Sequence, residues 1–455
     1  MPNRYLVFRS ATVTVLSFGL YLIFPTNAQD SQLVWSHTAL MTRPQTDKRQ
    51  AEPFENMEST DDIRYLCNRI GVRLRGTPNE HKAMRYLKQR FKGLGLDVEV
   101  EGFRIIAWEL LKEPKLAFLE PEKVHVPCKT YYYALPTPEE GIRGYLKAVG
   151  KMGDPYTRSV SSQDKYAIAS ESGKHEGYVI ASSTLNEERD TGGYLSDFFY
   201  PVVAVGAETK ERLEEWMSRG EKVKAWMHID SRFLPGAESY NVIGTLKGTK
   251  EPDKWIIIGA HYDSVINCLG AVDDASGVQV LINLAEKMVD EGYSKTIKFI
   301  AFGSEEYSAK GSLHYVMSLK ERGLLDNVEL YINLDAVGAA DRNLEPHRFR
   351  VHPEEHLRPI IEEALREEDV VEKFGWRTHF GRMKRGKKIW SYPGVDYQTF
   401  SQEGIPTISA GSDRYDHSHQ PTDEPDKIGP RVLALKTRLT QDILRRLATR
   451  QIFGN

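Results

Sequence analysis

The stretch WIIIGAHYDSVINCLGAVDDASGVQVLINLAEKMVDEG, residues 255–292, joins an apolar run, an acidic loop and an amphipathic segment. The run at 255–260 is almost free of polar side chains, which is typical of a strand covered on both faces. In the amphipathic segment the apolar residues at helical spacing are Val278, Leu281, Ile282, Ala285 and Val289. A buried strand followed by such a helix is the repeating unit of α/β proteins.

The same unit recurs on both sides of this stretch. TIKFIAFG (296–303) precedes the helical pattern KGSLHYVMSLKERG (310–323), and ELYINLD (329–335) follows as a third strand. Upstream, residues 81–103 predict a helix closed by Gly95 and then an alternating strand. The sequence therefore predicts an α/β fold with a largely parallel sheet, whose ligands bind at the carboxyl ends of the strands.

Residues 105–236 have a different character. Short strand-like runs, YYYALP (131–136), GYVIASSTLN (177–186) and FFYPVVAVGA (198–207), surround one helical pattern at 210–220. This favours a mostly β insert. We interpret Tyr131–Tyr133 as strand and core packing rather than a ligand platform.

Composition and the N-terminus limit the class of protein. A chain of 455 residues with a net charge of −3 and 40% hydrophobic residues is typical of a folded protein with two lobes, and its charge disfavours nucleic-acid binding. Residues 1–28 are typical of a signal peptide, since the uncharged stretch 10–24 is shorter than the roughly 20 residues that span a bilayer. We therefore expect a secreted or periplasmic protein without a stable membrane span; the alternative is an uncleaved anchor.

Three cysteines do not make a disulfide framework. Export would expose Cys67, Cys128 and Cys268 to oxidising conditions, in which one bridge could form, but the sequence does not give its pairing. We assign them no catalytic chemistry.

Acidic and imidazole side chains follow each predicted strand of 255–335. They are His261, Asp263, Asp273, Asp274, Glu305, Glu306 and Asp335, and residues 411–428 add His417 and His419. Clustered carboxylates repel one another unless a cation, a shared proton or solvent relieves the cost. Nitrogen and oxygen ligands without cysteine suit zinc or a similar divalent ion, and more than four of them indicate two ions. Asp263, two residues after His261, can hold the second nitrogen of that imidazole.

These motifs resemble peptidase family M28, a family of zinc exopeptidases. The shared features are AHYDS (260–264), an acid before DASG (274–277), the pair Glu305–Glu306, Asp335 and a late histidine. The resemblance covers about 60–104 and 237–430 and implies a three-layer α/β/α fold with a mixed, mostly parallel sheet. It implies two zinc ions per chain, held by His261, Asp273, Glu306, Asp335 and His419. Asp273 is then the bridging ligand, followed by a cis peptide bond, with Glu305 as general acid/base and Asp263 as the orienting acid.

The sequence departs from the family pattern at three places. His417 competes with His419 for the last ligand position, and HQPTD (419–423) favours His419. Ser304 stands where a glycine usually precedes the acidic pair. Ser418 stands where some members carry a tyrosine that donates to the oxyanion, and Tyr415 is a candidate replacement.

The resemblance implies an enzyme that removes N-terminal residues from peptides through metal-activated water and a glutamate base. Peptides with a free N-terminus are the expected partners, because an acidic site favours an α-ammonium group. One alternative is a carboxypeptidase or dipeptidase, with GRMKRGKK (381–388) binding the terminal carboxylate. A glutaminyl cyclase is disfavoured because its single-metal site does not need both His261 and Asp335. A non-catalytic receptor-like binding protein is the third alternative.

The expected organisation has five parts. These are a signal peptide (1–28), a linker (29–54), the first part of the catalytic domain (55–104), the insert (105–236) and the main part of the catalytic domain (237–450). In its last third, residues 200–230, the insert resembles a protease-associated domain.

Overall fold

A computed structural model describes most of the chain. The described residues are 61–152, 163–181, 200–339, 349–352, 357–367, 379–380, 394–411 and 417–449. The predicted signal peptide, the linker and the basic stretch 381–388 lie outside them. Within these ranges, no helix combines the length and the apolar character needed to cross a membrane.

A mixed sheet with a parallel centre forms the catalytic lobe. Strand β9 (Glu251–His261) pairs in parallel with β10 (Lys295–Phe302) and with β11 (Val328–Leu334), which in turn pairs in parallel with β14 (Thr407–Ala410). The outer strands are β8 (Lys224–Leu246), antiparallel to β10, and β12 (Phe349–His352), antiparallel to β14; β13 (His379–Phe380) pairs with β12. The predicted α/β fold with a mostly parallel sheet is confirmed.

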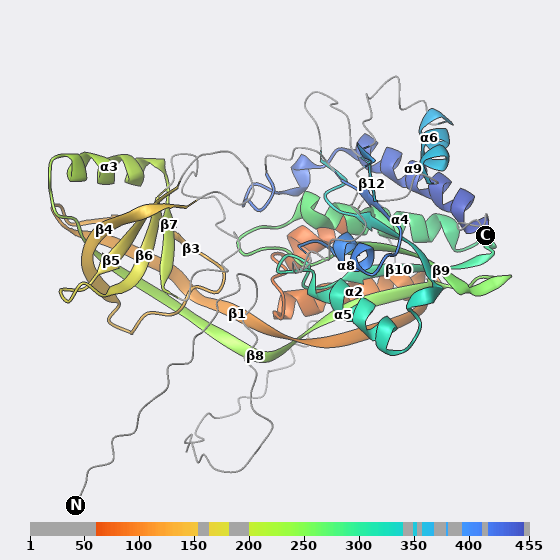
Figure 1. Ribbon diagram of the computed structural model, residues 1–455, viewed down its shortest axis with the longest axis horizontal. Helices are drawn as coiled ribbons and strands as arrows, with labels where there is room; N and C mark the ends of the chain where they lie inside the picture. The colour runs from red at the N-terminus through yellow and green to blue at the C-terminus, as the bar shows by residue number, and fades with distance from the viewer. Residues whose placement is uncertain are drawn as a thin grey trace, which may run out of the picture.

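Helices cover both faces of this sheet (Figure 1). In β9, Ile256 and Ile258 pack on one face and Ile257 on the other, all fully buried. Burying each such side chain contributes about 1.5–3 kcal/mol. The first face is covered by α1 (Asp61–Arg64), α2 (Pro78–Gly93), α4 (Ser276–Met288), α6 (Arg358–Glu367) and α9 (Pro430–Thr449). The second face is covered by α5 (Lys310–Glu321) and α8 (Asp396–Gln402).

The insert is a β-rich lobe with its own core. Besides parts of the two long strands described below, its strands are β2 (Val124–Val126), β3 (Lys129–Thr130), β4 (Ile142–Met152), β5 (Gln163–Ala169), β6 (His175–Ala181) and β7 (Val202–Val205). Helix α3 (Ala207–Ser218) packs against them. Buried side chains of these strands and of α3 form a cluster separate from the core of the catalytic lobe.

Two long strands join the lobes. β1 (Asp97–Glu120) and β8 are antiparallel partners from Asp97↔Thr245 to Glu120↔Lys224 and run from one lobe into the other (Figure 1). The sheet is therefore continuous through both lobes. The expected domain boundaries, at 104/105 and 236/237, fall inside these two strands.

One predicted strand is wrong. The run YYYALP, 131–136, begins just after β3 and forms a turn and an irregular segment. Tyr133 has a φ of 66°, a left-handed conformation that ends any extended pairing. Tyr131 and Tyr132 are nevertheless buried, as expected for core packing.

The three cysteines are free, so the described structure contains no disulfide. Burial raises the pKa of the Cys67 thiol to about 11 and that of Cys128 to about 12. Neither is therefore an ionised nucleophile near neutral pH.

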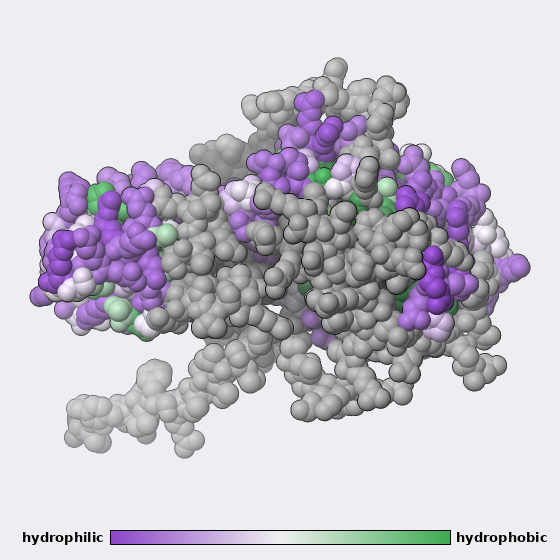
Figure 2. All heavy atoms as spheres, turned by 90° about the horizontal axis from the view of Figure 1, so that it is seen from above, coloured by the Kyte–Doolittle hydropathy of each residue, from purple (hydrophilic) through white to green (hydrophobic). Residues whose placement is uncertain are grey.

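The described surface in Figure 2 is mostly hydrophilic over both lobes, which agrees with the composition.

Candidate metal centre

The carboxyl ends of the parallel strands bring the predicted site residues together. His261 is the last residue of β9, Glu305 and Glu306 follow β10, and Asp335 follows β11. Asp273 comes from the turn η2 (Ala271–Ala275) before α4, and His419 from the segment before the turn η5 (Pro425–Lys427). All six side chains line one pocket, together with Gly394 and Val395.

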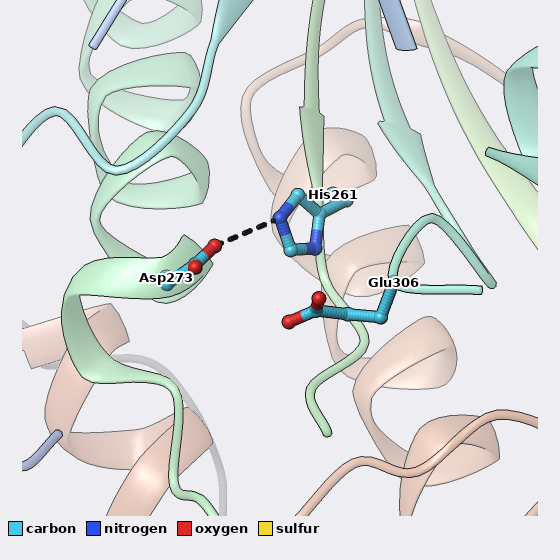
Figure 3. A group of neighbouring side chains, drawn as sticks. All are labelled: His261, Asp273 and Glu306. Carbon is cyan, nitrogen blue, oxygen red and sulfur yellow. Dashed lines mark hydrogen bonds and ion pairs between the residues drawn. The ribbon is translucent and has the colours of Figure 1, made fainter. Parts of the chain in front are cut away.

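Asp273 lies between two imidazoles. Its Oδ1 is 3.2 Å from Nε2 of His261, and its Oδ2 is 3.4 Å from Nε2 of His419. Figure 3 shows Asp273, His261 and Glu306 pointing toward one another from three different segments. The two oxygens of one carboxylate thus face two separate nitrogen donors.

Each imidazole has a second acid beside it. Nε2 of His261 is 4.0 Å from Oδ1 of Asp335, and Nε2 of His419 is 2.9 Å from Oε2 of Glu306. Oε2 of Glu305 is 3.9 Å from Nε2 of His261, on the same side of the pocket as Asp335. The donors therefore form two sets, each with one imidazole and one acid, that share Asp273.

His417 does not reach this pocket. Its Nδ1 lies 2.8 Å from Oγ1 of Thr422, and it is absent from the residues that line the cavity. His419 lines the pocket and has a left-handed φ of 57°. Of the two candidates, the geometry favours His419.

The pocket holds more negative charge than its two imidazoles balance. Burial, and then the Asp273 carboxylate, raise the pKa of Asp335 to about 7. Burial also raises the pKa of Glu305 and Glu306 above the ordinary range of a glutamate. Burial disfavours the Asp273 carboxylate as well, but hydrogen bonds with His261 and His419 outweigh it and hold its pKa low.

The donor set fits a divalent cation. Oε1 of Glu305 and Oε1 of Glu306 are buried and have no hydrogen-bond partner within the described part of the chain. One ligand atom from each of His261, Asp273 and Glu306 lies within 4.8 Å of the others, so donors of both sets face the same small space. Buried carboxylates without partners cost free energy unless a cation compensates them, and oxygen and imidazole donors without sulfur suit zinc.

Asp263 supports the site from behind. Its Oδ1 accepts a hydrogen bond from the Glu305 N–H at 2.9 Å and its Oδ2 from the Glu306 N–H at 3.3 Å. Oδ1 is also 3.6 Å from Nδ1 of His261. One fully buried carboxylate therefore fixes the backbone of the acidic pair and lies beside the imidazole of His261.

Two further buried aspartates hold the ligand segments, and sequence reasoning gave them no role. Asp274 accepts from the N–H groups of His261, Gly277 and Ala336, and so ties β9 to the segment after β11. Asp423 accepts from Val272 N–H at 2.9 Å and from Asp273 N–H at 3.2 Å. The only sequence signal was their place in the DASG and HQPTD motifs. The Asp273–Asp274 peptide bond is cis, as the resemblance implies.

Arg73 fixes the loop between His261 and Asp273. Its fully buried guanidinium donates to the carbonyl oxygens of Tyr262 at 2.7 Å, Leu269 at 2.7 Å and Gly270 at 3.1 Å. Sequence reasoning missed this contact too, because the partners are backbone atoms about 190 positions away.

Ser418 contacts the central aspartate. Its Oγ donates to Oδ2 of Asp273 at 3.1 Å, so the residue that replaces the tyrosine of some family members points at the pocket. Tyr415, the other candidate donor to an oxyanion, lies outside the described residues.

The fold and the pocket define the class: a three-layer α/β/α protein with a candidate metal site at the strand ends. Residues 241–443 match the family described as Peptidase family M28. This match, which covers less than half of the chain, agrees with the family that the motifs resemble.

Individual relatives agree with the class. The chain is 29% identical over 298 residues to Aminopeptidase YwaD of Bacillus subtilis, a match that covers 63% of each protein. It is 22% identical over 397 residues to Carboxypeptidase Q of Bos taurus, covering 80% of each. Among solved structures, a zinc aminopeptidase of Bacillus subtilis superposes with a TM-score of 0.66 at 21% identity over 86% of this chain and 95% of that one. This last likeness supports the fold.

Proposed function

We propose that this protein is an exopeptidase with two zinc ions that removes N-terminal residues from peptides. The observation that carries the proposal is the position of Asp273, whose two carboxylate oxygens face His261 on one side and His419 on the other. In this proposal His261 and Asp335 hold one ion, His419 and Glu306 hold the other, and Asp273 bridges them. Two zinc ions would supply a Lewis acid for the peptide carbonyl and would lower the pKa of a water molecule.

Glu305 is the proposed general acid/base. It lines the pocket beside Glu306, and burial raises its pKa, so that it can hold a proton taken from water and deliver it to the departing amine. Asp263 holds the Glu305 backbone N–H, which keeps that carboxylate aimed at the pocket. The same aspartate orients His261.

Acidic surroundings support a preference for the N-terminal end of the substrate. The described lining of the pocket has carboxylates and imidazoles but neither lysine nor arginine, so no side chain with a fixed positive charge favours a terminal carboxylate there. The relatives include a protein named for each activity, an aminopeptidase and a carboxypeptidase. Carboxypeptidase action is therefore the second candidate. The sequence of residues 1–28, which is typical of a signal peptide, supports an extracytoplasmic location.

Three matched peptides test this proposal. We expect the purified protein to release free amino acids from an unblocked peptide and from its C-terminal amide, but not from its N-acetylated form. A chelator should abolish the release and added zinc should restore it. Release from the N-acetylated peptide but not from the amide would assign carboxypeptidase action instead. Activity that survives thorough chelation would rule out the metal site as its source.

A further inference from the structure

We propose that Tyr132 and Arg75 are positioning residues: together they hold the loop of Glu305 and Glu306, so the insert is part of the support of the active site. The inference rests on the proposed roles of those two glutamates. Neither Tyr132 nor Arg75 lines the pocket, and neither belongs to the motifs on which the site was predicted.

The loop that carries the two glutamates needs support from outside itself. Within residues 304–309, Ser304, Ser308 and Ala309 have φ values of 57°, 79° and 46°. Residues other than glycine rarely adopt this left-handed backbone conformation, and it persists where surrounding contacts hold it. Asp263 holds the pocket side of the loop through the N–H groups of Glu305 and Glu306.

Arg75 holds the other end of the same loop. Its guanidinium donates to the carbonyl oxygen of Tyr307 at 3.1 Å, to that of Ile106 at 2.9 Å and to the hydroxyl of Tyr132 at 3.1 Å. The side chain is almost fully buried, at 4% exposure. It thus joins a loop of the catalytic lobe, strand β1 and the insert through one rigid group.

Tyr132 brings the insert directly onto the loop. Its ring stacks on that of Tyr307 with centroids 3.8 Å apart and planes 22° apart, and it packs edge-on against Trp108 at 5.5 Å. Tyr132 is 1% exposed, so its side of the stack is buried. Because Tyr307 follows Glu306 directly, this stack lies one residue from a proposed metal ligand and two from the proposed base.

The left-handed turn at Tyr133 explains why the aromatic run is not a strand. The turn lets Tyr132 stack on Tyr307 while the Tyr133 hydroxyl hydrogen-bonds to Arg75 and to the Ile106 carbonyl oxygen. Tyr131, the residue before Tyr132, packs instead into the core of the insert. Neighbouring tyrosines of one segment thus serve the two lobes separately.

Removing the stack should displace the acidic pair without touching the substrate. Groups that orient metal ligands typically change metal affinity or activity by about 10–100-fold when they are mutated. We therefore expect Tyr132→Ala to lower kcat about 10–100-fold, to lower zinc affinity in a chelator competition, and to leave KM within about twofold. Tyr132→Phe keeps the ring and should retain kcat within about threefold.

Tyr131→Ala is the matched control, since it removes a buried aromatic from the same segment without touching Tyr307. It should lower the melting temperature but keep kcat and zinc affinity. Arg75→Lys, which keeps the charge but loses the planar fork, tests the same loop if Tyr132→Ala does not fold, and should lower kcat about tenfold.

The outcomes are separable. Tyr132→Ala with unchanged kcat and zinc affinity would overturn the inference, and so would Tyr131→Ala with the same losses as Tyr132→Ala. If Tyr132→Ala does not fold, an unchanged kcat and zinc affinity in Arg75→Lys would overturn it. If the wild-type protein cleaves no peptide, the proposed function fails, but the chelator competition still decides whether Tyr132 holds the metal site.

Discussion

Glu305 differs from Glu306 in its contacts, although the two are neighbours in the chain. Glu306 lies 2.9 Å from His419, whereas the nearest imidazole nitrogen to Glu305 is 3.9 Å away. Proton transfer by a positioned carboxylate is worth about 10²–10⁴-fold in rate. We expect Glu305→Gln to lower kcat by that factor while the protein keeps its zinc, as measured by peptide release and metal content.

The exposed Glu321, at the end of α5, gives a matched control, because Glu321→Gln makes the same chemical change far from the pocket. It should leave kcat unchanged. Loss of zinc in Glu305→Gln would mean that Glu305 is a ligand rather than the base.

Asp423 holds the backbone of the Asp273 segment. Its Oδ1 accepts a hydrogen bond from the Val272 N–H, and its Oδ2 accepts one from the Asp273 N–H. Asn at this position can accept only one of them, and a buried donor left unsatisfied costs about 1–3 kcal/mol. We expect Asp423→Asn to lower both the melting temperature and zinc affinity, as followed by calorimetry and chelator competition.

Asp426 lies three positions further on, is exposed and pairs with Lys427. Asp426→Asn should change neither quantity. Equal effects of the two substitutions would show that Asp423 does not hold the Asp273 segment.

At the scale of elements, the start of α4 must pass very close to β11. A Cβ atom at Gly277 would lie 2.4 Å from the carboxylate of Asp274 and 2.5 Å from the carbonyl oxygen of Leu334. The glycine of DASG is thus required by close packing. We expect Gly277→Ala to destabilise the protein by about 1–3 kcal/mol, the usual cost of overpacking, seen as a lower melting temperature.

Gly292, in the exposed segment after α4, has no atom within 4 Å of such a Cβ. Gly292→Ala should change stability by less than about 0.5 kcal/mol. A Gly277→Ala protein as stable as the Gly292→Ala protein would contradict this account of the helix start.

The elements of the catalytic lobe were predictable because their local patterns agree with their environment. Ile256–Ile258 are apolar on both faces since helices cover both faces, and α4 has the helical spacing that its buried side requires. The strand predicted at YYYALP was wrong, because the aromatic side chains of this run serve packing in the two lobes and not strand pairing. Contacts such as that of Arg73 with Leu269 join distant segments through backbone atoms, which leave no mark in a single sequence. Asp423 stands in the HQPTD motif, but the motif does not reveal its contact with Val272.

At the scale of the whole molecule, the fold concentrates acidic groups that its net charge of −3 does not reveal. A ligand that binds only the folded state stabilises it, by about 2.7 kcal/mol at one hundred times its dissociation constant. We expect chelation to lower the melting temperature and zinc to restore it. Scanning calorimetry with and without chelator measures the shift.

Asp273→Asn provides the control for this experiment, since it weakens both proposed ion positions. Its melting temperature should respond much less to chelator and to zinc. A wild-type protein that melts at the same temperature with and without chelator would contradict the proposed ion pair.

The paired strands β1 and β8 have a consequence for how the insert can vary. Ile105 of β1 pairs directly with Ala237 of β8, so the chain leaves the catalytic lobe and returns to it at paired positions of two neighbouring strands. The insert is therefore connected to the catalytic sheet like the loop of a single hairpin. Lengthening the insert would cost little free energy at this junction, because the closure entropy of a loop grows only slowly with residue number. Loops at the far end of the insert can thus be lengthened, trimmed or exchanged with little penalty to the rest of the molecule.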